Sequence, residues 1–172
     1  SVDSALVYRG MDIGTAKPTA AERAAVPHHL IDILDPAEPY SAGQFLRDAR
    51  RLVAEVLGRG RVPLFVGGTL LYLRVLREGI GQLPDADPQL RAWLDAQGKR
   101  LGWPALHARL AELDPPAAAK IGQRDGQRIQ RALEVYYITG DTLSQCQGQH
   151  SEAGLDVALK ILALWPADRA IL

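Results

Sequence analysis

Asp3 is the first residue whose type and position could carry out chemistry. It precedes Ser4, so that a carboxylate stands beside a hydroxyl directly after the predicted end of a strand. Ligands of open parallel sheets bind beyond the carboxyl ends of the strands, and a carboxylate there could accept a proton from a bound substrate. An Asp-Ser pair also commonly forms an Asx turn or a helix cap, and the pair alone favours that structural interpretation.

A second polar group follows a short apolar run at Gly67-Gly68-Thr69, where a helical pattern begins. The exposed backbone amides and the helix dipole at such a junction favour an anionic group. Two glycines equally permit a tight turn with close packing, without any ligand. The residue types alone leave both interpretations open.

The third group is Gln127-Arg128-Ile129-Gln130-Arg131, at the start of a predicted helix. Its two arginines are three residues apart and therefore share a helix face, with the two glutamines beside them. Such a cluster can hold phosphates of a nucleic acid and place amides near base edges. On the sequence alone, the solvated face of an ordinary amphipathic helix is the simpler interpretation.

The spacing of apolar residues predicts the elements that must position these groups. A helix is expected over Ser41–Leu57, where Ser41 and Gln44 form a capping box, and Gly58 and Gly60 end it. An apolar run, a glycine turn and a helix in this order are typical of a parallel sheet with crossover helices. Further helices are expected over Leu70–Glu78 and over Asp125–Ile138 with Gly140 as terminator, and strands over His29–Leu34, Val62–Val66 and Val157–Leu164.

The pattern changes between Gly79 and Gly126, where prolines punctuate two short predicted helices, Pro88–Gln97 and Pro104–Leu113. We therefore expect an α/β core over residues 1–78 and 124–172, with a helical insertion over residues 79–123. Residues 141–155 are rich in Gln, Gly and Ser, which predicts a loop or a short helix.

Composition restricts the classes of protein to which the chain can belong. Its 20 basic and 20 acidic residues cancel, so any contact with nucleic acid must come from a local cluster. The single Cys146 cannot form an internal disulfide, and the adjacent His28 and His29 lack a third ligand, so we expect no metal site from these residues. No apolar run approaches the length of a membrane span, and a cytoplasmic protein is expected.

The first eighteen residues, Ser1–Pro18, resemble the DS-x-x-VY-x-x-(M/L)-DIGTAKP signature of bacterial tRNA dimethylallyltransferases. Enzymes of this family attach a five-carbon prenyl group to the adenosine on the 3′ side of the anticodon. The resemblance implies an α/β fold of P-loop-kinase type with a parallel sheet and a helical insertion. It also implies a nucleotide-binding, magnesium-dependent monomer whose partners are dimethylallyl diphosphate and the tRNA anticodon stem-loop.

The resemblance also implies roles for individual positions. Asp3 matches the general base, which accepts a proton from the exocyclic amine of the target adenosine, a poor nucleophile because its lone pair is delocalised into the ring. Arg169 matches an arginine that binds the diphosphate of the prenyl donor. The positions implied to contact tRNA are Asp3, Ser4, Ala5, Leu6, Thr69, Arg91, Gln127, Arg128, Ile129, Gln130 and Arg131.

The sequence contains no G-x-x-x-x-G-K-[ST] loop, the element that cradles a pyrophosphate and positions Mg²⁺. In the resembled family this loop lies upstream of the segment that matches Ser1, so the chain is expected to be a fragment that is inactive alone. Two alternatives stay open. One is an adenylate isopentenyltransferase acting on free nucleotides, which would have little use for the insertion, and the other is a non-catalytic RNA-binding module.

Overall fold

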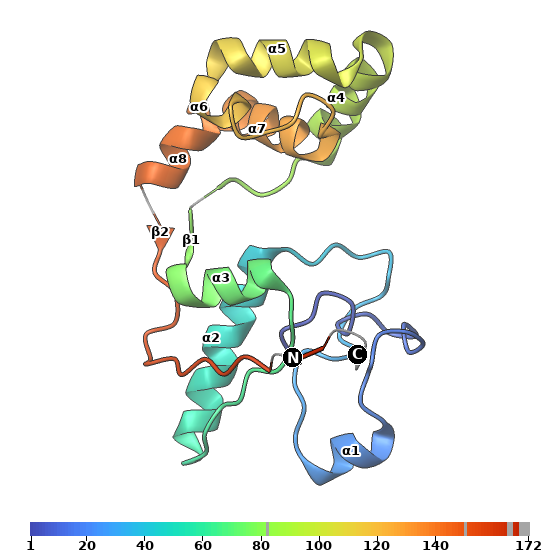
Figure 1. The fold of residues 1–172 in the computed structure, drawn as a ribbon, viewed down its shortest axis with the longest axis vertical. Coiled ribbons are helices and arrows are strands. Elements are labelled where there is room, and N and C mark those ends of the chain that lie inside the picture. Colours follow the sequence, from blue (N-terminus) through green and yellow to red (C-terminus); the bar gives the residue numbers. More distant parts are fainter. Residues whose placement is uncertain (82, 150, 165–166, 169–172) are drawn as a thin grey trace. The chain divides into compact units, whose positions relative to one another are not determined.

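The computed structural model describes residues 1–81, 83–149, 151–164 and 167–168, and it divides into two units. Unit 1 comprises Ser1–Gly79 together with the chain from Ala153 onward, and unit 2 comprises Ile80–Glu152 (Figure 1). In the described part of the chain, no helix combines the length and the apolar character needed to cross a membrane.

The described residues of unit 1 form the helices α1 (Ala20–Ala25), α2 (Ala42–Gly58) and α3 (Leu70–Glu78). The predicted capping box of α2 is confirmed, because Ser41 and Gln44 exchange side-chain and backbone hydrogen bonds. Helix α2 packs against α3, and between them the rings of Phe45 and Tyr72 stack with their centroids 4.0 Å apart. The apolar face of α2 that the sequence predicted is buried at Phe45, Leu46, Ala49 and Val53.

Parallel pairing among the described residues is limited to two single bridges, Val2 with Gly67 and Tyr8 with Leu34. The three strands expected from the sequence form no ladder, and within Val62–Val66 the side chains of Val62 and Leu64 are largely exposed. The backbone hydrogen bonds supply a physical reason. Among the described residues, the segment 62–66 takes part in one of them, from Val2 N to Val66 O at 2.7 Å. A buried strand draws both its hydrogen bonds and its burial from its neighbours.

Unit 2 is helical, and Figure 1 shows its longer helices gathered into one cluster. Its core is formed by Leu94, Leu106, Leu110, Ala118, Ile129, Ala132 and Leu133. The elements are β1 (Ile80–Gly81), α4 (Pro88–Leu101), α5 (Trp103–Leu113), α6 (Pro115–Ala118), α7 (Gly126–Thr139), α8 (Leu143–Gln149) and β2 (Ser151–Glu152), with β1 and β2 antiparallel.

Helix α7 departs from the division expected from the sequence, which grouped residues 124–172 with the α/β core. Its buried face, which includes Ile129 and Leu133, packs against α4 and α5, so the structure groups it with unit 2. The end of α7 agrees with the prediction, because Gly140 takes the left-handed conformation there with φ of +78°.

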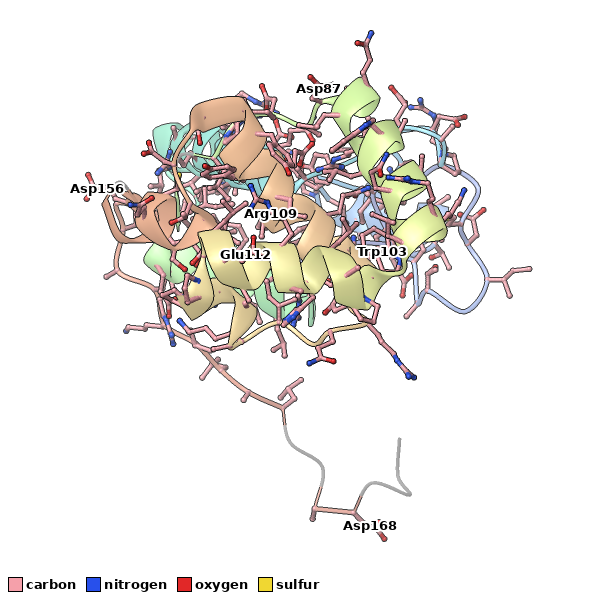
Figure 2. The ribbon with its side chains drawn as sticks, turned by 90° about the horizontal axis from the view of Figure 1, so that it is seen from above. Asp87, Trp103, Arg109, Glu112, Asp156 and Asp168 are labelled. Carbon is pink, nitrogen blue, oxygen red and sulfur yellow. The ribbon has the colours of Figure 1, made fainter. Side chains whose placement is uncertain are left out.

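Aspartates begin several of the helices of unit 2. Asp87 accepts hydrogen bonds from two backbone amides at the start of α4, where Figure 2 labels it. Asp114 is buried, and its two oxygens accept from Ala117 N at 3.1 Å in α6 and from Ser144 N at 2.9 Å in α8. One buried carboxylate therefore satisfies backbone donors of two helices.

Candidate functional site

Asp3 lies in a turn, and its two carboxylate oxygens have different surroundings. Oδ1 accepts hydrogen bonds from the backbone amides of Ala5 at 2.7 Å and Leu6 at 3.2 Å, which is the Asx turn that the sequence left open. Among the described residues no group donates a hydrogen bond to Oδ2. Oδ2 is not a buried atom without a partner, because Ser1 Oγ is the only such side-chain atom in the described part of the chain. One oxygen is thus held by backbone amides, while the other can accept a proton.

Thr69 lies beside this turn. Its Oγ1 accepts from the backbone amide of Ser4 at 3.0 Å and donates to Ser4 Oγ at 3.4 Å. Thr69 is also the N-cap of α3, but its side chain makes no capping bond to that helix. The structure therefore brings together two of the polar groups identified in the sequence.

Gly67 makes this approach possible. Val2 N donates to Val66 O at 2.7 Å, and Thr69 N donates to Val2 O at 3.1 Å. A Cβ on Gly67 would lie 2.2 Å from the carbonyl oxygen of Val2, and its φ of +149° is rare for residues with a side chain. Gly67, the first glycine of the pair, therefore serves close packing at this point, one of the two interpretations that the sequence left open.

Lys17 belongs to a charged network that the sequence analysis missed. Its buried Nζ donates to Tyr8 O at 2.8 Å, to Asp12 at 2.8 Å and to Asp32 at 2.6 Å, and Arg23 donates to the other oxygen of Asp32 at 2.5 Å. Burial would lower the pKa of Lys17, but the two carboxylates outweigh it and the pKa is raised. The hydrogen bond from Lys17 is the main cause of the lowered pKa of Asp32. This network fixes the segment that follows the Asp3 turn.

Tyr72 is a further residue of this region whose position the sequence did not indicate. Its ring is buried against Phe45, and burial raises the pKa of its hydroxyl to about 12, with smaller contributions from the charges of Tyr8 and Asp3. The phenol therefore stays protonated near Asp3 at neutral pH, where it can donate a hydrogen bond but cannot act as a base.

In unit 2, Arg91 and Arg131 meet at Glu134, whose side chain is fully buried. Gln130 belongs to the same cluster, because its amide donates to Arg91 O at 3.1 Å and to Asp95 at 2.7 Å. Three residues predicted from the sequence to contact RNA thus lie together. The carboxylates that connect them were not identified from the sequence.

The other predicted residues of α7 divide between surface and core. Gln127 and Arg128 are exposed, and the Arg128 side chain, 70% exposed, has Nε 3.5 Å from the carboxylate of Asp125. Asp125 also caps α7 by accepting from the backbone amide of Arg128. Ile129 is fully buried in the core of unit 2, so its side chain does not reach the surface.

In the described part of the chain, the candidate site is marked neither by a cluster of metal ligands nor by either of two cavities of unit 1. Among the described residues, no three or more His, Cys, Asp or Glu side chains are grouped as an ion would require. Unit 1 has a cavity of about 440 Å³ beside α2 and one of about 480 Å³ beside α1, and no predicted site residue lines either of them. Arg169, predicted to bind diphosphate, lies outside the described residues.

Comparisons with known proteins cover nearly the whole chain. A family model described as IPP transferase matches residues 6–172. The tRNA dimethylallyltransferase of Aromatoleum aromaticum is 59% identical over 172 residues, which is 100% of this chain and 54% of that protein. The enzyme of the same name from Burkholderia mallei is 59% identical over 175 residues, with the same coverage. The chain thus spans about half the length of the curated relatives it matches.

A solved structure is also similar. It is that of a eukaryotic dimethylallyltransferase acting on tRNA, which is 28% identical and aligns with a TM-score of 0.68. The alignment covers 89% of this chain and 38% of the solved one.

Proposed function

The chain belongs to the IPP transferase family, and we propose that it is part of a tRNA dimethylallyltransferase. The proposed reaction moves the dimethylallyl group from dimethylallyl diphosphate to the exocyclic amine of the adenosine 3′ of the anticodon. The observation that carries the proposal is the 59% identity to tRNA dimethylallyltransferases along the entire chain. The TM-score of 0.68 to a dimethylallyltransferase supports a P-loop-type fold, in which the two parallel bridges of unit 1 would belong to a parallel sheet.

Asp3 is the proposed general base. As the amine nitrogen bonds to the first carbon of the prenyl group, the carbon–oxygen bond to the diphosphate breaks and the diphosphate leaves. The nitrogen then carries an excess proton, which Oδ2 of Asp3 accepts. The Asx turn supports this role, because two backbone amides hold Oδ1 and so orient the second oxygen without occupying it.

The target base has to leave the stack of neighbouring bases, because the enzyme cannot reach the amine while the base is stacked. We propose that Thr69 and the turn of Ser4, Ala5 and Leu6 contact the extruded nucleotide. Unit 2 would contact the RNA backbone, and the exposure of Gln127 and Arg128 supports this assignment. Mg²⁺ is expected from the family, but the described residues offer no cluster of ligands that fits it, so no step is assigned to a metal.

A chimera tests the proposal in a full-length setting. The 172 residues replace the matching segment of the Aromatoleum aromaticum relative, and transfer of labelled dimethylallyl groups to tRNA is measured. We expect transfer by the chimera and a loss of about 100-fold or more in Asp3→Asn, the range typical of general-base removal. Asp35→Asn is the matched control, because Asp35 is exposed and its Oδ1 also accepts a local amide, that of Ala37.

Each outcome has a separate meaning. An inactive chimera beside an active relative would count against the proposed function of this chain. Full activity in Asp3→Asn would refute the role of the base while leaving the enzyme class intact. Transfer to AMP in preference to tRNA would favour the free-nucleotide enzyme that the sequence left open.

A further inference from the structure

Glu134 of α7 has a fully buried side chain that accepts hydrogen bonds at both of its oxygens. Oε1 accepts from Arg91 Nε at 2.8 Å and from the backbone amide of Asp87 at 2.9 Å. Oε2 accepts from Arg91 Nη2 at 3.0 Å and from Arg131 Nη1 at 2.6 Å. The carboxylate therefore joins α7 to the start of α4 and to an arginine on each helix.

A buried carboxylate is a costly way to join two helices. It loses its hydration, and paired charges in a protein interior are often no more stabilising than apolar side chains of similar size. The neighbours of Glu134 in α7, Leu133 and Val135, are fully buried apolar residues. An apolar side chain at position 134 would therefore have extended the apolar core. Packing alone does not account for the acid here, and its effect on the two arginines is the feature to explain.

The arginines keep donors that the network does not use. Arg91 is anchored through Nε and Nη2, which leaves Nη1, and its side chain is 41% exposed. Arg131 donates from Nη1 to Glu134 and from Nη2 to Pro84 O at 2.8 Å, which leaves Nε. Each guanidinium is thus fixed along one edge, and for Arg91 much of the side chain faces solvent.

Nearby carboxylates offset the positive charge of the two arginines in this cluster. Asp95 attracts Arg91 and accepts from Gln130, and Asp87 caps α4, so three carboxylates including Glu134 accompany two arginines. Such a cluster does not attract a polyanion by its overall charge. A phosphate would be recognised here through directed N–H donors, which are effective only when held in place.

We propose that Glu134 is a positioning residue, which holds Arg91 and Arg131 in the orientation that contacts the RNA backbone. This inference rests on the proposed function, because it assumes that unit 2 contacts tRNA. The buried acid restricts both guanidinium groups before the RNA arrives, so that less rotamer freedom is lost on binding.

The test measures binding of a labelled anticodon stem-loop RNA to the 172-residue chain. Glu134→Gln keeps the shape of the side chain but removes its charge and replaces one acceptor with a donor. We expect affinity to fall about tenfold, the order of one charge-assisted hydrogen bond. Glu112→Gln is the matched control, because Glu112 pairs with Arg109 at 2.7 Å on the exposed side of α5 in the same unit (Figure 2). Both substitutions remove one negative charge, which by itself would strengthen RNA binding.

A double substitution separates positioning from general support of the fold. Arg91→Gln alone should weaken RNA binding. Adding Glu134→Gln to the Arg91→Gln variant should weaken binding far less than Glu134→Gln weakens it in the parent chain. Equal and additive losses would overturn the inference, because they would show that Glu134 acts independently of the arginine. If Glu134→Gln fails to fold by circular dichroism, Arg91→Lys replaces it, since lysine keeps the charge and lacks the two-point anchor. Parent-like binding by Arg91→Lys would also overturn the inference.

A second measurement does not depend on RNA. In the parent, the Arg91 Nε–H signal in NMR spectra should exchange slowly with solvent, and in Glu134→Gln it should exchange rapidly. Unchanged exchange would refute the positioning role whether or not the RNA binds. Absence of RNA binding by the parent, with the exchange result as expected, would count against the RNA contact proposed for unit 2 and not against the anchoring by Glu134.

Discussion

Replacement of Gly67 by alanine should separate the Asp3 turn from α3. The added Cβ would lie 2.2 Å from Val2 O, so the two segments must part by about 1 Å to reach ordinary contact. That movement breaks or weakens the bonds Val2 N to Val66 O and Thr69 N to Val2 O, which contribute about 0.5–1.5 kcal/mol each. The φ of +149° adds about 1 kcal/mol or more, so we expect a loss of about 2–4 kcal/mol in the free energy of unfolding.

Urea unfolding of the 172-residue chain, followed through backbone amide NMR signals of unit 1, measures this loss. Gly68→Ala is the control, because a Cβ on Gly68 meets nothing within 4 Å. The Thr69 amide should also lose its protection from hydrogen exchange in Gly67→Ala and keep it in Gly68→Ala. Equal unfolding midpoints for the two variants would refute the close approach of Val2 to Gly67 and, with it, the placement of Asp3 beside Thr69.

Two further predictions concern buried carboxylates of unit 2. Asp114→Ala removes the acceptors for Ala117 N and Ser144 N and should lower the free energy of unfolding by about 2 kcal/mol. Asp114→Asn should have an intermediate effect. Urea titrations followed through the backbone amide NMR signals of α7 measure both losses. Burial would raise the pKa of Glu134, but hydrogen bonds led by that from Arg91 outweigh it and the pKa lies below its ordinary 4.5. The ionised Glu134 therefore contributes its full stabilisation above about pH 4.5, and this contribution is lost as the pH falls through the lowered pKa. Glu134→Gln should make the free energy of unfolding, measured by urea titration at a series of pH values, fall less steeply below about pH 4.5. An unchanged dependence on pH in this range would contradict the prediction.

Helices with local signals could be predicted from the sequence alone. The predicted range Ser41–Leu57 corresponds to α2 at Ala42–Gly58, and the predicted Leu70–Glu78 is α3 itself. These elements depend on caps and apolar spacing within a few residues of each other, which the sequence displays directly.

Strands and unit boundaries depend on partners that are distant in sequence. Val62–Val66 has the composition of a buried strand, but a ladder forms only where a neighbouring chain segment supplies donors and acceptors. The same limit applied to α7, because its amphipathic pattern could not show whether α4 or a sheet would cover its apolar face.

The site illustrates the limit most clearly at Glu134. In the sequence, Arg131 and Glu134 form an ordinary pair three residues apart, of the kind that usually lies on a solvated helix surface. Glu134 is nevertheless fully buried, and Arg91 and the amide of Asp87 donate to it from the start of α4, more than forty residues earlier in the chain. A pattern within one helix cannot contain that information.

These contacts also show how the equal numbers of acidic and basic residues in the chain bear on RNA binding. Arg91 and Arg131 share a buried acid, and Lys17 and Arg23 share Asp32, so these basic side chains are already committed to folded structure. RNA contact by such a chain would depend on a few exposed cations and on arginine edges held in fixed directions. Its affinity should therefore depend on salt less steeply than that of a basic protein of this size, while single substitutions that release one anchored arginine should matter more.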